Sequence, residues 1–141
     1  MIKQGLAVAV GLVLAMAAIM GIELLSAQLF PIPGNFMAMD SVDQGAVMDE
    51  LPFAAKALVV FGWGLGSFVG ALAVRWIAGP GWLGLAVVAL VILGGLVNVF
   101  TIPHPLWMRA GAVIAPLIGY WLAGLVPVAS GTLRWRWRAA G

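Results

Sequence analysis

The sequence contains no cysteine, and only 9% of its 141 residues are charged. The absence of cysteine excludes disulfides, thiol nucleophiles and thiolate metal sites, and with them four-helix enzymes that pass electrons from thiols to quinones. His104 is the single histidine, which excludes a haem held by two histidines of one chain. A soluble domain has roughly 25% charged residues, so the scarcity of charge indicates that lipid is the solvent of this chain.

Long apolar runs take the place of charge, and 64% of the residues are hydrophobic. Without water in the hydrocarbon core, the backbone must satisfy its own polar groups in a helix or a closed barrel, and continuous apolar runs favour helices. We therefore predict an all-α membrane protein of a single domain, with four transmembrane helices in an antiparallel bundle. The predicted helices are residues 5–30, 54–77, 82–102 and 106–129.

The connections and the basic residues predict the orientation. Residues 31–53 form a long acidic connection, whereas the other two connections are short. Lys3, Arg75 and the basic, Trp-rich tail at 130–141 fall on one side of such a bundle, and positive flanks stay in the cytoplasm. We expect a multi-pass protein of the bacterial inner membrane with both termini cytoplasmic and an outer loop at 31–53. The alternating Arg and Trp of the tail favour an interfacial anchor over a protein-docking motif.

Small residues recur at four-residue spacing on the predicted helices, and Asn98 follows a glycine pair. Such residues let helix backbones approach closely, either within the bundle or between copies of the chain. The expected packing positions are Gly62, Gly66, Gly70, Gly94, Gly95, Gly111, Ala115 and Gly119.

Glu23 is the only ionisable residue within the run 5–30. An acid inside a membrane helix costs a few kcal/mol or more without a partner, so it marks a candidate site. Other polar residues fall near the same predicted outer end of the bundle. The candidates for a ligand or proton site are Glu23, Ser26, Gln28, Asn98, His104 and Arg109.

Three interpretations of Glu23 remain open. It could be a structural acid held by Arg109, Lys56 or helix-end donors, and we favour this clasp of the outer end. It could exchange protons with a substrate in a coupled transporter. It could also act with His104 in a metal or acid–base site, which is the weakest interpretation because the acids show no ligand spacing. No catalytic residue, metal or cofactor is assigned.

Two resemblances accompany these residues. Four helices with a glutamate in the first are similar to the small multidrug resistance transporters, although Glu23 lies near one helix end and the first connection is long. The Gly-Gly-x-x-Asn and Pro-x-Pro-x-Trp patterns within residues 94–107 resemble a family of uncharacterised small bacterial membrane proteins. That resemblance covers most of residues 5–125 and implies the four-helix fold without naming an activity.

The function expected from the sequence is binding within the membrane. We expect an accessory or assembly subunit of a membrane complex, or a small oligomeric module, whose partners are lipid, copies of itself or a larger complex. Nucleic acid is not expected, because the net charge is only +2. The alternative is a small proton-coupled transporter that uses Glu23.

Overall fold

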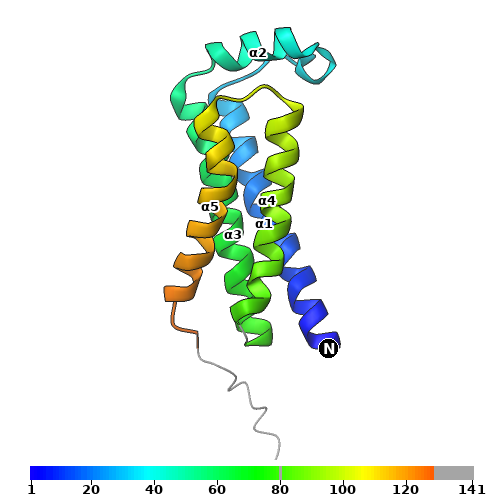
Figure 1. The fold of residues 1–141 in the computed structure, drawn as a ribbon, viewed down its shortest axis with the longest axis vertical. Coiled ribbons are helices and arrows are strands. Elements are labelled where there is room, and N and C mark those ends of the chain that lie inside the picture. Colours follow the sequence, from blue (N-terminus) through cyan, green and yellow to red (C-terminus); the bar gives the residue numbers. More distant parts are fainter. Residues whose placement is uncertain (80, 129–141) are drawn as a thin grey trace, which may run out of the picture.

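The computed structural model describes residues 1–79 and 81–128, and within these ranges every regular element is helical (Figure 1). Two of the elements are short 3-10 helices and five are α-helices. In chain order they are α1 (Ile2–Leu29), η1 (Phe36–Ala38), α2 (Ser41–Glu50), α3 (Phe53–Ala78), η2 (Gly81–Leu83), α4 (Gly84–Thr101) and α5 (Leu106–Leu125).

Four of these helices, α1, α3, α4 and α5, are long and apolar enough to cross a membrane, α4 together with the η2 turn before it. They run alternately up and down, so the N-terminus and the end of α5 lie at the same end of the bundle (Figure 1). Helix α2 lies across the other end, called the capped end below. The predicted all-helical architecture with four helices able to span a membrane is confirmed.

The helix ends differ from the predicted ones by a few residues, for local reasons. Helix α5 ends at Leu125 because Val126 precedes Pro127 and adopts an extended conformation with ψ of 120°. Helix α3 ends at Ala78, and Gly79 caps it with a φ of +87°, which favours glycine. The tail at 130–141, predicted as a basic anchor, lies outside the described residues.

The connection at 31–53 is not the plain loop that the sequence predicted, because it contains η1 and α2. Asp40 caps α2, and its carboxylate accepts hydrogen bonds of 2.9 Å from the backbone N–H groups of Val42 and Asp43. Gln44 and Met48, one turn apart, are the buried positions of α2. The acidic residues of the connection therefore cap or belong to a helix whose inner face covers the bundle.

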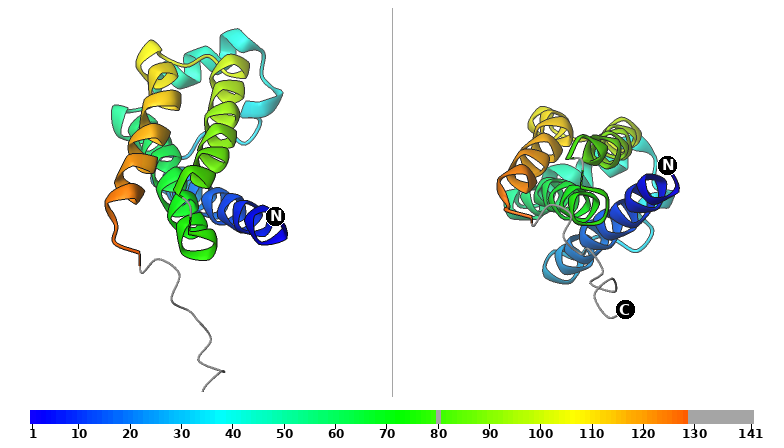
Figure 2. Two further views of the ribbon diagram at one scale, coloured as in Figure 1. Left: turned by 60° about the horizontal axis from the view of Figure 1, so that its bottom comes forward. Right: turned by 90° about the horizontal axis from the view of Figure 1, so that it is seen from below.

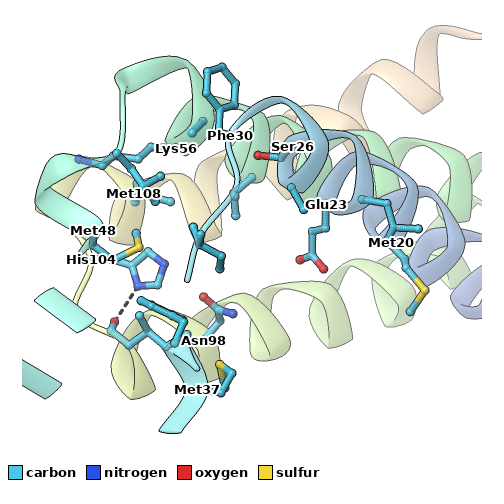
Figure 3. Close-up of a pocket in the computed structure, with 18 residues that line it drawn as sticks. Met20, Glu23, Ser26, Phe30, Met37, Met48, Lys56, Asn98, His104 and Met108 are labelled. Atoms are coloured by element: carbon cyan, nitrogen blue, oxygen red, sulfur yellow. Dashed lines mark hydrogen bonds between the residues drawn. The ribbon is translucent and has the colours of Figure 1, made fainter. Parts of the chain in front are cut away.

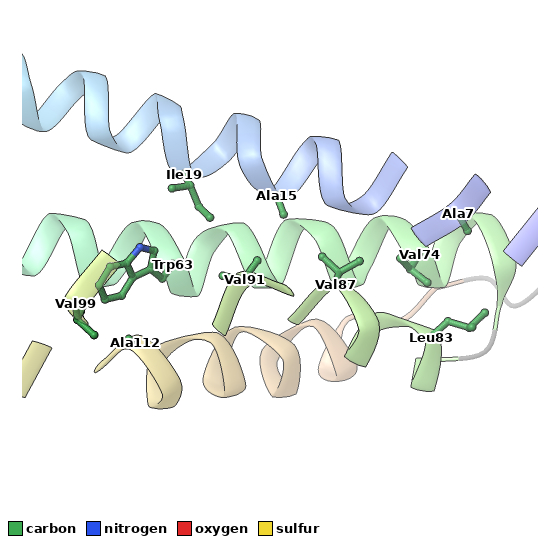
Figure 4. Close-up of a cluster of buried hydrophobic side chains, with 10 residues drawn as sticks. All are labelled: Ala7, Ala15, Ile19, Trp63, Val74, Leu83, Val87, Val91, Val99 and Ala112. Carbon is green, nitrogen blue, oxygen red and sulfur yellow. The ribbon is translucent and has the colours of Figure 1, made fainter. Parts of the chain in front are cut away.

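Helix α3 is the centre of the bundle and packs against α1, α4 and α5. The main apolar cluster lies along it and includes Ala15 and Ile19 of α1, Trp63 and Val74 of α3, and Val87 of α4 (Figure 4). Apart from Trp63, its members are small or branched side chains such as alanine, valine and isoleucine. The core is therefore held by close backbone approach, as the small-residue pattern predicts for a bundle in lipid.

The α1–α3 contact depends on the glycines of α3. A Cβ atom at Gly66 would lie 2.9 Å from the Ala15 carbonyl oxygen, and one at Gly70 would lie 2.7 Å from the Gly11 carbonyl oxygen. At Gly62 the nearest atom would be an Ile22 side-chain carbon at 3.3 Å. The contact thus tightens from the capped end toward the opposite end of the bundle.

Helix α5 packs on α3 and α4 through the other small residues. A Cβ atom at Gly119 would overlap the backbone of α3 at Gly64, and one at Gly111 would lie 2.8 Å from a Val60 methyl group. Ala115 also faces Gly64, and Gly95 of α4 faces α5. Gly94 departs from the packing prediction, because a Cβ atom there would meet no atom within 4 Å.

Hydrogen bonds join the helices at the end opposite α2. The Arg75 guanidinium donates through Nη1 to the carbonyl oxygens of Ala123 and Val126, where α5 has unpaired acceptors. The Tyr120 hydroxyl donates to the Gly81 carbonyl oxygen at 3.2 Å. Arg75, identified in the sequence as an orientation signal, therefore also fastens α3 to the end of α5.

Candidate functional site

A pocket of about 440 Å³ lies at the capped end, between α1 and α4 and beneath α2 (Figure 3). Its floor and walls come from the spanning helices, and its roof comes from the connection that contains η1 and α2. The lining is mostly apolar and carries five residues with polar side chains. These are Glu23, Ser26, Lys56, Asn98 and His104.

The structure brings together four of the six predicted site residues, namely Glu23, Ser26, Asn98 and His104. The other two do not line the pocket. Gln28 is five residues from Glu23, which turns it well away around α1, and it is exposed. Arg109 donates from Nε to the His104 carbonyl oxygen at 3.2 Å, so it holds the turn between α4 and α5.

Glu23 has no protein partner among the described residues. The structure shows no ion pair in the described part of the chain, and none of its side-chain hydrogen bonds involves Glu23. The carboxylate points into the pocket toward Asn98 (Figure 3). The clasp with Arg109 or Lys56 that we favoured from the sequence is therefore absent from these residues. An acid within an apolar helix needs a partner, and the open space before Glu23 is the pocket itself.

His104 is buried between two prolines, with 9% of its surface exposed. Its Nδ1 donates to the Ile102 carbonyl oxygen at 2.6 Å, which fixes the ring and leaves Nε2 as the acceptor of the neutral form. Burial lowers the pKa of His104 below 6.5, the hydrogen bond to Ile102 opposes this shift, and the Arg109 charge adds to it. At neutral pH His104 is therefore an uncharged member of the pocket lining.

Methionines supply much of the apolar lining, since four of the seven in the chain face the pocket. Methionine is flexible and polarisable, so it adapts to ligands of different shape. The four are Met20 on α1, Met37 in η1, Met48 on α2 and Met108 on α5.

The sequence interpretation missed the roof of the pocket because residues 31–53 were taken as loop. Phe36 and Met48 are buried there, and together with Met108 they form a separate apolar cluster. Gln44 joins the two short helices of the roof by donating from Nε2 to the Phe36 carbonyl oxygen at 3.1 Å. The sequence signal for the helix at residues 41–50 is Asp40, an N-cap residue type, which stands directly before this helix and its two buried positions one turn apart.

The polar groups of the pocket do not form a metal centre. Among the described residues, no three His, Asp or Glu side chains lie close enough to hold a metal ion. Glu23 lies on α1 and His104 in the turn between α4 and α5, and Asn98 separates them in the lining (Figure 3).

Comparison of the chain with protein-family models, with curated proteins and with solved structures gives no match. The chemistry of the pocket therefore rests on its own geometry, and the two family resemblances remain expectations.

Proposed function

We propose that this chain is an integral membrane binding protein that holds a small amphipathic molecule, an apolar body with a protonated amine, in the pocket beneath α2. The observation that carries the proposal is the Glu23 carboxylate, which points into an apolar pocket and has no partner among the described residues. Glu23 is exposed at this pocket, within a helix long and apolar enough to span a membrane, and a carboxylate that faces lipid without a partner costs a few kcal/mol or more, which a bound cation would offset.

The volume and the lining of the pocket support a small ligand. Pockets for drug-sized molecules measure about 300–1,000 Å³ and are mainly apolar with a few polar groups, and this pocket falls in that range. Its methionine side chains can repack around different apolar bodies. The lining therefore favours a class of amphiphiles over one rigid compound.

The charges of the pocket favour a donor as the ligand's polar group. An ionised carboxylate only accepts hydrogen bonds, so Glu23 calls for a donor, and the Asn98 amide oxygen can accept a second bond. Lys56 lies in the first turn of α3, and a lysine at a helix end extends its ammonium to the headgroup layer. The Lys56 nitrogen is directed away from Glu23 (Figure 3), so Glu23 is the charged group available to a ligand beside Asn98.

The cellular setting is part of the same proposal. We infer the bacterial inner membrane, with both termini cytoplasmic and α2 outside, from the basic residues Lys3 and Arg75 at the end opposite α2. Ligand binding would serve an accessory or assembly subunit of a membrane complex, or a small oligomeric module. Helix α1 supports this role because most of its surface is free of the bundle and open to a further helix.

The test compares two amphiphiles that differ only in the polar group. Calorimetry of the purified chain in detergent should show binding of n-decylammonium, and Glu23→Gln should weaken it about tenfold or more, since a charge-assisted hydrogen bond contributes about 1.5–3 kcal/mol. Binding of n-decanol should be weak and should not change with Glu23→Gln. Asp43→Asn, which removes an exposed acid of α2, is the matched control. Equal affinity of n-decylammonium for wild type and Glu23→Gln would contradict the proposal.

A second candidate function, proton-coupled transport, is favoured by the position of Glu23 as the single acid of the pocket. A carboxylate binds either a proton or a cation, but not both. The two therefore compete for Glu23, and a transporter that exchanges protons for a cationic substrate requires this competition. In proteoliposomes with a pH gradient, n-decylammonium would then cause faster proton movement with wild type than with Glu23→Gln, whose rate measures the free amine that crosses the bilayer unaided. Binding with equal proton movement in the two proteins would reject transport and retain the binding function.

A further inference from the structure

The pocket is covered on the side of the water but not on the side of the lipid. Phe36 and Met48 form its roof and are buried. Ala55 and Val59 of α3 form its back wall, together with Met108 of α5, which is fully buried. The remaining side lies between α1 and α4.

Helices α1 and α4 meet only over a short stretch and then diverge toward the capped end. They are in contact where Gly11 faces Val87, at 3.2 Å from a Cβ atom on Gly11 to a Val87 methyl group. Helical spacing places Val91, Gly94 and Asn98 on the same side of α4 as Val87. Val91 is still buried. Gly94 is exposed, and a Cβ atom built on it would have no other atom within 4 Å. Asn98, one turn further, lines the pocket. The side of α4 that faces α1 is therefore packed against α1 near Val87 and is separated from it by the opening of the pocket from Gly94 onward.

The rim of this opening is apolar. Met20 and Leu24 of α1 line the pocket and are nevertheless 59% and 61% exposed. On α4, the exposed side chains of Leu90 and Val97 lie about 40° and about 60° around the helix from Gly94. All four lie within helices long and apolar enough to span a membrane. The mouth of the pocket is thus placed in the hydrocarbon layer, where an apolar rim meets lipid tails at no cost.

We propose that the ligand enters and leaves the pocket sideways from the bilayer, through the opening between α1 and α4, and that Gly94 keeps this opening clear. The ligand is then a membrane-dissolved amphipathic amine, a class that rests on the proposed function. Its apolar body travels through lipid while its amine reaches Glu23, and the α2 roof separates this route from water. A large side chain at Gly94 would project into the opening without disturbing a helix contact.

The absence of cysteine allows a direct test with single-cysteine variants in proteoliposomes. Ser26→Cys places a thiol in the pocket, Ser41→Cys places one on the exposed start of α2, and Leu93→Cys places one toward lipid. The reagents are N-pyrenylmaleimide, which dissolves in the bilayer, and a sulfonated maleimide, which stays in water. We expect the pyrene reagent to label Ser26→Cys at a rate close to that of Leu93→Cys. We expect the sulfonated reagent to label Ser26→Cys at least about tenfold more slowly than Ser41→Cys, a barrier difference of about 1.4 kcal/mol.

The entrance is then closed in the Ser26→Cys background. Gly94→Phe should slow pyrene labelling of the pocket thiol about tenfold, again about 1.4 kcal/mol. Gly21→Phe should leave the rate unchanged, because Gly21 is also exposed with nothing within 4 Å but lies about 100° from Met20 and about 160° from Glu23 around α1. Far-UV circular dichroism and size-exclusion elution of both variants check that the fold is retained.

Two results would overturn the lateral entrance. One is labelling of Ser26→Cys by the sulfonated reagent at the rate of Ser41→Cys, which would mean entry from water. The other is an unchanged pyrene rate in a folded Gly94→Phe variant. No amine is present in these reactions, so failure of n-decylammonium binding would reject the ligand class while the labelling result would still decide the entrance.

Discussion

The graded contact between α1 and α3 makes a quantitative prediction about three glycines of one helix. Gly62, Gly66 and Gly70 lie on the same stripe of α3 and face α1 at decreasing distance. Replacing each in turn by alanine adds one methyl group and changes nothing else. The three variants therefore measure how much space the α1–α3 contact leaves at three depths of the bundle.

The magnitudes follow from the distances. At Gly62 the new methyl group would meet the Cγ2 and Cβ atoms of Ile22 at 3.3 and 3.4 Å, and this mild crowding should offset most of the about 0.5–1 kcal/mol that the helix propensity of alanine contributes. At Gly70 it would lie 2.7 Å from the Gly11 carbonyl oxygen, where backbone must move, and overpacking of this kind costs about 1–3 kcal/mol. Gly66→Ala should also destabilise the fold, since the Ala15 carbonyl oxygen lies at 2.9 Å.

The assay is reversible unfolding by sodium dodecyl sulfate in mixed micelles, followed by far-UV circular dichroism and tryptophan fluorescence. We expect the free energy of unfolding to fall in the order Gly62→Ala, Gly66→Ala, Gly70→Ala, with Gly70→Ala about 2 kcal/mol below Gly62→Ala. Gly94→Ala, with no neighbour within 4 Å, is the control and should be the most stable of the four variants. Equal stability of Gly62→Ala and Gly70→Ala would refute the close α1–α3 contact.

Three further predictions concern the two ends of the bundle. Arg75→Lys should lower the free energy of unfolding by about 1–2 kcal/mol in the same titration, because lysine lacks the guanidinium that donates to two carbonyl groups at the end of α5. An unchanged free energy of unfolding would exclude a role of Arg75 in joining α3 to α5. Asp40→Ala should speed amide hydrogen exchange within α2 by an amount equivalent to about 1 kcal/mol, while exchange in α3 stays as it is; unaltered protection of α2 would argue against the cap. The lowered pKa of His104 means that the unfolded chain binds the proton more readily, so stability should be full above pH 6.5 and be lost as the pH falls below it. His104→Gln should remove that pH dependence, and a parallel pH profile in both proteins would contradict it.

The candidate site was only partly predictable. Glu23 and Asn98 could be selected because polar residues in apolar runs are rare, and the structure places both in one pocket. Their neighbours could not be selected, because methionines such as Met20 and Met48 are ordinary apolar residues until helices bring them together. Arg109 was the expected partner of Glu23, yet it bonds the His104 carbonyl oxygen instead. Such a choice depends on side-chain direction, which sequence spacing does not give.

The sequence by itself determined that this is a helical membrane protein with four helices able to span the bilayer. Long apolar runs with few charges have no other way to satisfy their backbone in lipid, so this conclusion depends on composition and length alone. The sequence also indicated close helix packing, because glycine at four-residue spacing has a fixed position on a helix.

Only the tertiary structure decided that Gly94 faces open space, that residues 41–50 form a roof, and that Glu23 points into a pocket without a partner among the described residues. The opening at Gly94 and the pocket before Glu23 depend on the angle at which α1 crosses the bundle (Figure 2). That angle results from the sum of many small contacts along α3, and no single residue of the sequence encodes it.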